Sequence, residues 1–309
     1  MIPFNLSSGD MLADRRFEYG EGLMADGDAA AAAELFEQAL ERAPDWAAAW
    51  AALGAARLAN GDRAGAADAY RTALRFAPAD PFAASLKLAL IEGTEAPESP
   101  PDAYVRELFD QYAPKFEAAL VGDLDYRAPG LLAGLIASAA GGAAFGRALD
   151  LGCGTGLMGE EIRADVRHLE GVDLSAAMVD AAAGKRAHGR PLYDALSVGD
   201  VVAHLAASRD RYDLIVAADV FCYLGNLAPV FEAAAARMGQ GALFAFSVER
   251  GDDGGSGWTL RDSMRFAHGR RYLEDTARAA GFTVSHIEDA DLRRDRGVPV
   301  GGYLVVLRR

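Results

Sequence analysis

The chain has 309 residues and a formal net charge of −14 at pH 7, which allows two domains with buried cores. This acidity argues against a nucleic-acid partner, because phosphate binding needs a basic face. Cys153 and Cys222 are too few for a disulfide framework and lack metal-ligand spacing. No apolar stretch is long enough to span a membrane, and the N-terminus lacks signal-peptide regions. We therefore expect a cytoplasmic protein that binds neither metal nor membrane.

The first part of the chain, residues 13–92, repeats itself with a period of 34 residues when Pro44 is aligned with Pro78. The matching pairs are Gly20 with Gly54, Asp28 with Asp62, Ala32 with Ala66, Phe36 with Tyr70 and Ala39 with Ala73. Small residues at fixed offsets let two antiparallel helices approach closely, and the proline ends each second helix. This pattern resembles two tetratricopeptide repeats, although Arg16 stands at the tryptophan position of the first. A third helix, about Pro81–Ile91, is expected to cap the stack.

The role of the repeat region has two interpretations. It could form a groove for a peptide or protein partner, or it could be a packing or self-association element without a ligand. Alanine dominates the first helices and leaves few groups to recognise a ligand, which favours packing. Two repeats also fall short of the three usually needed for a stable solenoid. We therefore expect this region to lean on the second domain or on another subunit.

A proline-rich segment at 93–101 marks the predicted domain boundary, giving a helical domain at 1–96 and a second domain at 97–309. Next come an amphipathic helix at 102–120, interrupted near Pro114, and a helix at 128–140. We treat residues 102–140 as lid or substrate helices.

From residue 145 onward, strand and helix patterns alternate. The predicted strands are 146–151, 167–172, 195–198, 213–217 and 242–248, and the predicted helices are 156–163, 175–187, 201–207, 226–238 and 270–280. This alternation predicts a mostly parallel sheet with helices on both faces. Two final strands, 282–288 and 303–307, are predicted as an antiparallel edge pair joined by a charged turn at 293–296.

A glycine loop follows the first of these strands, in Arg147-Ala-Leu-Asp-Leu-Gly-Cys-Gly-Thr-Gly156. A dinucleotide site wants its third glycine at position 157, which is leucine here. The acid Asp150, just ahead of the loop, suits an ammonium group better than a pyrophosphate. No segment matches the phosphate loop of nucleotide triphosphatases.

Four segments in order resemble the motifs of class I S-adenosylmethionine-dependent methyltransferases: 148–156, 171–178, 197–200 and 211–219. The resemblance covers about 102–309. Together with the repeats, Phe109-Asp-Gln-Tyr112 and Arg265-Phe-Ala-His268 resemble a group of bacterial predicted methyltransferases. The resemblance implies a Rossmann-like domain with a seven-stranded sheet, S-adenosyl-L-methionine as cofactor and S-adenosyl-L-homocysteine as product.

The resemblance also implies roles for single residues. Asp150 would hold the α-ammonium, Asp173 the ribose hydroxyls and Asp200 the adenine amino group. The full set of implied cofactor residues is Asp150, Gly152, Cys153, Gly154, Gly156, Asp173, Leu174, Met178, Asp200, Val201 and Ala217. The alternative is a purely structural role, in which Asp173 and Asp200 only cap the helices that follow them.

The acceptor side is less specific. His268 is the candidate general base, with the alternative that it only bonds backbone ahead of the next helix. Candidate substrate residues are Tyr112, Phe221, Tyr223 and Arg271. The glycine-rich segment 251–257 is either a mobile lid or a turn. Residues 219–222 lack the Asn-Pro-Pro-Tyr-type element of amide methylation, which favours a small molecule with an oxygen or nitrogen acceptor. Two alternatives are a protein methyltransferase whose repeats recruit its target and an adaptor that only senses the cofactor.

Overall fold

The computed structural model describes residues 7–113, 116, 125–252, 254, 257–295 and 297–309. The chain forms two compact units, Met1–Leu108 and Phe109–Arg309. They divide within helix α6 (Asp102–Tyr112), downstream of the proline-rich segment where the sequence placed the boundary. No helix in the described ranges is long and apolar enough to cross a membrane.

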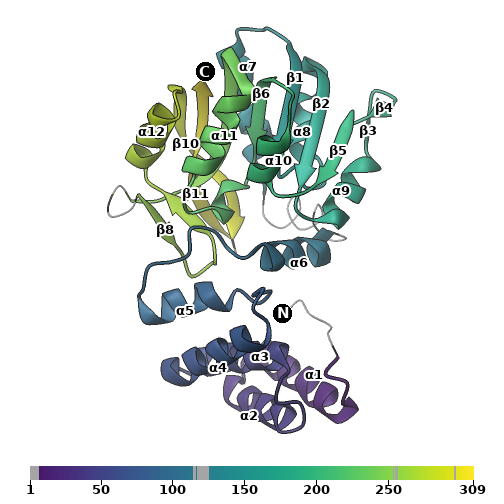
Figure 1. Cartoon of the computed structure of the whole chain (residues 1–309), viewed down its shortest axis with the longest axis vertical. Coiled ribbons are helices and arrows are strands. Elements are labelled where there is room, and N and C mark those ends of the chain that lie inside the picture. The colour runs from purple at the N-terminus through teal and green to yellow at the C-terminus, as the bar shows by residue number, and fades with distance from the viewer. Residues whose placement is uncertain (1–6, 114–115, 117–124, 253, 255–256, 296) are drawn as a thin grey trace. The chain divides into compact units, whose positions relative to one another are not determined.

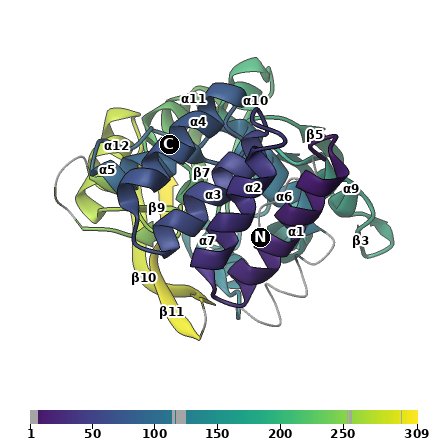
Figure 2. The same ribbon diagram turned by 90° about the horizontal axis from the view of Figure 1, so that it is seen from below.

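The first unit is built from helical pairs (Figures 1 and 2). Its helices are α1 (Met11–Ala25), α2 (Ala29–Leu40), α3 (Ala47–Ala59), α4 (Arg63–Phe76) and α5 (Ala84–Glu92). Helix α1 packs on α2, and α3 packs on α4. A Cβ at Gly20 would lie 2.5 Å from the Phe36 ring, and one at Gly54 would lie 2.8 Å from the Tyr70 ring. The 34-residue pattern therefore reflects one glycine-on-aromatic contact made twice.

The two equivalent aspartates of the repeat also act alike. Asp28 accepts a hydrogen bond from the Ala31 amide at 3.0 Å, and Asp62 accepts one from the Gly65 amide at 2.9 Å. Each carboxylate thereby caps the start of the second helix of its pair. The same capping chemistry thus starts α2 and α4.

The second unit is a sheet with helices on both faces. Its main path has the strand order β10-β11-β7-β6-β1-β2-β5. The strands are β1 (Phe145–Leu151), β2 (Val166–Asp173), β5 (Ala195–Val198), β6 (Tyr212–Ala217), β7 (Met238–Arg250), β10 (Thr283–Asp295) and β11 (Val298–Arg308). The pairs from β7 to β5 are parallel, and β11 is antiparallel to both of its neighbours. The predicted Rossmann-like sheet with its antiparallel edge pair is confirmed.

Alternating side chains divide the core of this unit into two layers, because successive strand residues face opposite sides of a sheet. Ile215 and Phe244 face helices α10 (Val201–Ala207), α11 (Ala228–Arg237) and α12 (Arg270–Ala279). Their neighbours Leu214 and Leu243 face α7 (Ala128–Ala140) and α8 (Leu157–Ile162), with Ala182 of α9 (Ala176–Ala183). Figure 1 shows these helices on either side of the sheet.

Four strands were not predicted. Strands β8 (Trp258–Leu260) and β9 (Phe266–His268) form a hairpin whose second strand runs parallel to the end of β7. Strands β3 (Arg186–Ala187) and β4 (Arg190–Pro191) form a separate short hairpin. The glycine-rich segment 251–257 therefore leads into added sheet; residues 253, 255 and 256 lie outside the described part, so the lid interpretation stays a prediction.

Two further expectations need correction. Residues 293–295 were predicted as part of a charged turn, but they belong to β10, which pairs with β11 as far as Asp295; Arg296 lies outside the described residues. Strands β10 and β11 form a two-stranded ribbon whose tip extends beyond β7, since β11 pairs with β7 only from Gly302 onward (Figure 2). The helix predicted at 102–120 ends as α6 at Tyr112, and residues 117–120 are not among those described.

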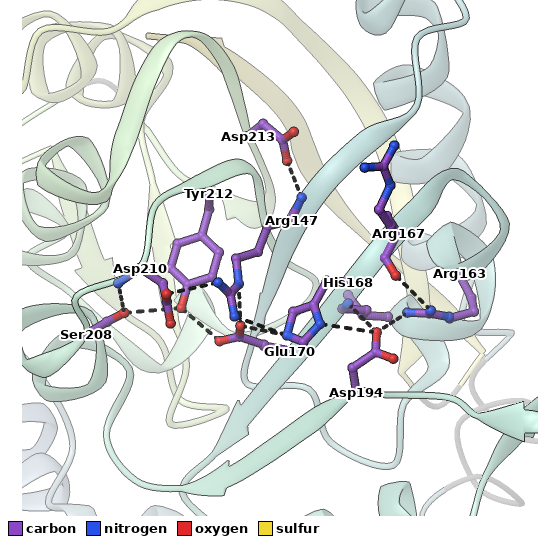
Figure 3. Close-up of polar contacts among 11 residues, drawn as sticks. Arg147, Arg163, Arg167, His168, Glu170, Asp194, Ser208, Asp210, Tyr212 and Asp213 are labelled. Atoms are coloured by element: carbon purple, nitrogen blue, oxygen red, sulfur yellow. Dashed lines mark hydrogen bonds and ion pairs between the residues drawn. The ribbon is translucent and has the colours of Figure 1, made fainter.

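A polar network ties the amino-terminal halves of the parallel strands together (Figure 3). Glu170 on β2 accepts hydrogen bonds from Arg147 at 2.6 Å and from the Tyr212 hydroxyl at 3.0 Å. Asp194, just before β5, accepts from the buried Arg163 at 2.9 Å and from the Leu169 amide at 2.8 Å. This network lies at the end of the sheet opposite the glycine loop, so it holds the strands in place without facing the site described below.

Candidate cofactor and acceptor site

Three aspartates mark the carboxyl ends of adjacent parallel strands. Asp150 is near the end of β1, Asp173 ends β2, and Asp219 follows β6. Because β1 pairs in parallel with both β2 and β6, the three strand ends meet at one edge of the sheet. In open α/β sheets, ligands bind in the crevice at this edge.

The glycine loop after β1 has the backbone shape that glycine requires. Gly152, Gly154 and Gly156 have φ values of 64°, 52° and 101°. A Cβ at Gly152 would lie 2.5 Å from Cγ2 of Val220, so the loop packs directly against the segment that follows β6. Within the loop, the Cys153 amide donates to the Val172 carbonyl at 3.0 Å, which anchors the turn to β2.

Asp173 sits where the loop meets β2. One carboxylate oxygen accepts a hydrogen bond from the Gly154 amide at 2.8 Å, and the other accepts one from the Ser175 amide at 2.9 Å. Burial raises the pKa of Asp173, and the two amide hydrogen bonds oppose that shift. Each oxygen has a second lone pair, so Asp173 can still accept from a ligand's hydroxyl groups. Helix α9 is capped by Ser175, whose hydroxyl accepts from Met178 at 3.1 Å.

Asp150 is almost fully buried and incompletely satisfied. Its Oδ2 accepts a hydrogen bond from the Tyr193 hydroxyl at 2.6 Å, whereas its Oδ1 has no hydrogen-bond partner. Burial raises the pKa of Asp150 to about 7, with Tyr193 opposing the shift and Asp173 adding to it. A buried carboxylate oxygen without a partner is costly. An ammonium group placed there would satisfy Oδ1 and favour the charged carboxylate.

The remaining implied cofactor residues divide into two groups. Asp200 accepts a hydrogen bond from the Ala203 amide at 2.8 Å and so caps α10, as the alternative of a structural role predicts. This cap leaves its other oxygen available. Leu174 is half-buried, whereas Met178, Val201 and Ala217 are buried in the core. Met178 and Ala217 therefore belong to the core that supports the glycine loop and the strand ends.

His268 is placed on β9 with no exposed surface. Its Nε2 lies 3.1 Å from the Gly225 carbonyl oxygen, and its ring stacks on Tyr272. Burial lowers the pKa of His268 to about 4. The ring is therefore neutral at physiological pH and bonded to backbone, which is the alternative the sequence left open.

The four candidate substrate residues lie in different surroundings. Tyr223 contacts Phe109 edge-on at 5.3 Å, and the exposed Tyr112 contacts Phe116 at 5.8 Å. Phe221, in contrast, is packed among core phenylalanines such as Phe246, while the Arg271 side chain is 81% exposed on α12 beside Asp275. Tyr223 thus lies at the edge of the sheet near Asp219, whereas the Phe221 side chain is packed in the core and Arg271 is exposed on α12.

The structure gives contacts at the site that were not assigned from the sequence. Asp219 has a φ of 60°, and its carboxylate accepts a hydrogen bond from Arg293 at 2.7 Å. Tyr193 supports Asp150, and Asp110 accepts a hydrogen bond from Ser175 beside Asp173. Asp110 and Asp219 lie in segments that carry the family resemblance, whereas Arg293 lies in a run of charged residues that favours an exposed position.

Comparison with known proteins gives the family. The family model described as "Methyltransferase domain" matches residues 124–287, more than half of the chain. The chain belongs to this methyltransferase family. It is an S-adenosylmethionine-dependent methyltransferase, and S-adenosylmethionine is its cofactor. No curated protein matches the sequence.

Two solved structures show how widely the fold is shared. The magnesium protoporphyrin IX methyltransferase ChlM from Synechocystis PCC 6803, with bound SAM, is 14% identical with a TM-score of 0.51, and the match covers 67% of this chain and 96% of that one. The cyclase SpnF is 18% identical with a TM-score of 0.56, covering 68% and 97%. Because one of the two is described as a cyclase, the shared fold does not by itself identify a substrate.

Proposed function

We propose that this methyltransferase transfers a methyl group to an oxygen or nitrogen acceptor of a small molecule. The supporting observation is a pocket of about 770 Å³ lined by Glu249, Arg265 and Arg293. Arg293 hydrogen-bonds Asp219, which adjoins the residue packed under the glycine loop. Pockets for small ligands commonly fall between about 300 and 1,000 Å³, so this volume suits a small acceptor.

We assign the cofactor to the cradle formed by the loop and the strand ends. Asp150 Oδ1 would take the α-ammonium, and Asp173 would accept from the ribose hydroxyls. Asp200 and Val201 would face the adenine. When bound, S-adenosylmethionine supplies a methyl group on a sulfonium that is already a good leaving group. The residues of the chain then contribute mainly by positioning the acceptor at about 3–3.5 Å in line with that methyl.

Proton transfer places a limit on the acceptor. Burial raises the pKa values of Tyr126, Cys222 and Tyr223 above their ordinary values, so these groups keep their protons at neutral pH and cannot act as bases. The candidate base His268 is neutral but has no exposed surface. We therefore favour an acceptor whose lone pair is already available at neutral pH, such as an aromatic amine or an anionic oxygen.

The assignment of Asp173 is tested by titrating S-adenosylhomocysteine into wild-type protein and Asp173→Ala by calorimetry. We expect the variant to bind about 1 to 3 kcal/mol more weakly, because it loses buried charge-assisted hydrogen bonds. Asp180→Ala is the matched control, since Asp180 is exposed on α9, the helix that follows Asp173 in the chain. Equal affinity in all three proteins would remove the ribose assignment.

A second candidate function is a protein methyltransferase whose target is recruited by the first unit. It is favoured by the glycine-on-aromatic contacts of that unit, which we interpret as two tetratricopeptide repeats. The same repeats could instead mediate self-association, or serve an adaptor whose second unit only senses the cofactor.

Deleting residues 1–96 separates these readings, with cofactor binding measured to confirm folding. Turnover of a small acceptor that is unchanged by the deletion supports the first proposal and excludes recruitment. Loss of turnover on a protein target alone supports the second. Binding without any turnover supports the adaptor, and all three readings are compatible with a cytoplasmic location.

A further inference from the structure

The pocket beside Asp219 is lined by more arginine than its acidic protein would suggest. Its walls include Arg261 and Arg265 from the β8–β9 hairpin and Arg293 and Arg294 from β10, with Glu249 at the end of β7. The chain as a whole carries a net charge of −14. A concentration of guanidinium groups in one pocket therefore needs a local explanation.

Two carboxylates beside the pocket, Glu249 and Asp219, already have arginine partners. Glu249 accepts from Arg293 through Oε1 and from Arg261 at 3.2 Å through Oε2. Asp219 accepts from Arg293 at 2.7 Å and lies near Arg265. Because Glu249 and Asp219 are both engaged with arginine, a cationic ligand would have to break existing ion pairs to reach them; Asp262 and Asp295, which also line the pocket, are exposed.

Arg265 is the arginine whose donors are not fully used. Its Nη1 is buried and makes no hydrogen bond, since the distances to Asp219 and Glu249 are 3.5 and 3.7 Å. Its guanidinium carbon lies 5.3 Å from the centre of the Tyr223 ring, a cation–π contact that restrains the group. A buried donor without a partner is costly, so a ligand that accepts from Nη1 would recover that cost.

The charge balance indicates what kind of ligand fits. Arg261, Arg265 and Arg293 carry three positive charges against two negative charges on Asp219 and Glu249. The adjoining Cys222 and Tyr223 are neutral at neutral pH because burial raises their pKa values. The cluster of these five mutually paired residues thus has a surplus of one positive charge, which matches a monoanion better than a phosphate dianion. Arg294, Asp262 and Asp295, which also line the pocket, are exposed to solvent that screens their charges.

We propose that the methyl acceptor carries a carboxylate group, and that Arg265 binds this carboxylate in the pocket beside Asp219. The proposal rests on the proposed function, because it takes this pocket to be the acceptor site. A planar guanidinium held against an aromatic ring presents paired donors that suit the two oxygens of a carboxylate. Arg293 and Arg261 then hold the surrounding acids so that these do not compete for Arg265.

The test compares a carboxylate with its neutral isostere on the full chain loaded with S-adenosylhomocysteine. The probes are 3-phenylpropionate, 3-phenylpropionamide and phenyl phosphate, with affinities measured by ligand-observed NMR titration. We expect the carboxylate to bind about tenfold or more tightly than the amide, because a charge-assisted pair replaces a neutral hydrogen bond. Phenyl phosphate should bind no better than the carboxylate.

Two substitutions locate the effect. Arg265→Gln should remove the preference for the carboxylate, and Arg265→Lys should retain part of it, since lysine keeps the charge but loses the planar donors. Arg270→Gln is the control, because Arg270 is exposed on α12 and pairs with Glu274. Cofactor-product affinity is measured for each protein, which reports folding and the cofactor site independently of the acceptor pocket.

The outcomes separate the two proposals. Normal binding of S-adenosylhomocysteine with no carboxylate preference, including no binding of any probe at millimolar concentration, overturns the acceptor inference alone. A preference for phenyl phosphate overturns the carboxylate assignment, and a preference that survives Arg265→Gln overturns the role of Arg265. Failure to bind S-adenosylhomocysteine counts against the proposed function itself.

Discussion

The two ends of the parallel strands carry polar clusters of opposite character. At the amino-terminal end, Glu170 accepts from Arg147 and Tyr212, and Asp194 accepts from Arg163 and a backbone amide. At the carboxyl-terminal end, Asp150 has an oxygen without a hydrogen bond, and Arg265 has a nitrogen that makes only long ion pairs with Asp219 and Glu249. Both clusters are partly or wholly buried, so exposure does not explain the contrast.

This difference distinguishes buried polar groups that stabilise the fold from buried polar groups that are available to a ligand. Buried charges whose partners are supplied by the protein hold strands together, whereas buried atoms left unpaired store a cost that a ligand can recover. One orphan donor, Arg163 Nε, occurs at the amino-terminal end as well. The rest of the Arg163 guanidinium is hydrogen-bonded, among others to Asp194. The two ends therefore differ more clearly in whether their carboxylates are hydrogen-bonded than in whether their arginines are.

The largest expected effect concerns Asp150 and pH. Its pKa is about 7 in the folded protein against an ordinary value of 3.8, so the folded state holds a proton that the unfolded state releases between these values. This contribution to stability is therefore lost as pH rises toward 7. We therefore compare the free energy of unfolding of the wild type with that of Asp150→Asn. The wild-type value relative to the variant should be roughly 3 kcal/mol lower at about pH 8 than at about pH 5.

Urea unfolding of both proteins at the two pH values measures this difference. The same Asp150→Asn variant should bind S-adenosylhomocysteine about tenfold or more weakly at neutral pH, because the ammonium loses a charged partner. A stability difference that does not change with pH would mean that Asp150 is ionised like an ordinary surface acid.

The next effect comes from Gly152→Ala. Its Cβ would meet Val220 at 2.5 Å, and its φ of 64° is unfavourable for alanine, so we expect a loss of about 2 kcal/mol in stability together with weaker cofactor binding. Adding Val220→Ala should recover the steric part but leave the backbone part. A double-mutant cycle by urea unfolding measures the coupling, and strictly additive losses would contradict the close contact.

Glu170→Gln probes the opposite end of the strands. The substitution weakens the pairing with Arg147 while keeping an acceptor for Tyr212, so we expect a stability loss of about 1 kcal/mol. Affinity for S-adenosylhomocysteine should stay unchanged, as calorimetry would show. A marked fall in affinity would mean that the two ends of the sheet are not functionally separate.

The smallest effect is expected for Arg271→Gln. This side chain is 81% exposed, so stability should change by less than about 0.5 kcal/mol. Binding of 3-phenylpropionate should match the wild type in the same NMR titration. A clear loss of binding would restore Arg271 to the acceptor site that the sequence proposed for it.

Most of the second unit's architecture could be predicted from residue patterns. Strand β5 and helices α7 and α10 have the predicted bounds. Gly141 ends α7, and Asp200 caps the start of α10. Strands β8 and β9 were missed because each has only three residues, which is too short for a period to show. The charged end of β10 was also missed, since its side chains lack the apolar alternation of a strand.

The site was predictable only where a motif carried it. Asp150, Asp173 and the loop glycines follow from spacing along one βαβ unit. The pairing of Asp219 with Arg293 joins residues that are 74 positions apart, and no local pattern signals such a contact. His268 illustrates the reverse problem, because a histidine in a promising segment has its ring buried and bonded to backbone.

The β8–β9 hairpin has a consequence for how acceptor choice can diversify. It carries Arg261 and Arg265, and β9 joins the sheet through two residue pairs, Glu249 with Ala267 and Arg250 with His268. The cofactor cradle is encoded in other segments, around Asp150 and Asp173. Exchange of residues 251–265 between related proteins could therefore change the selectivity for the acceptor, while the segments that bind the cofactor stay the same.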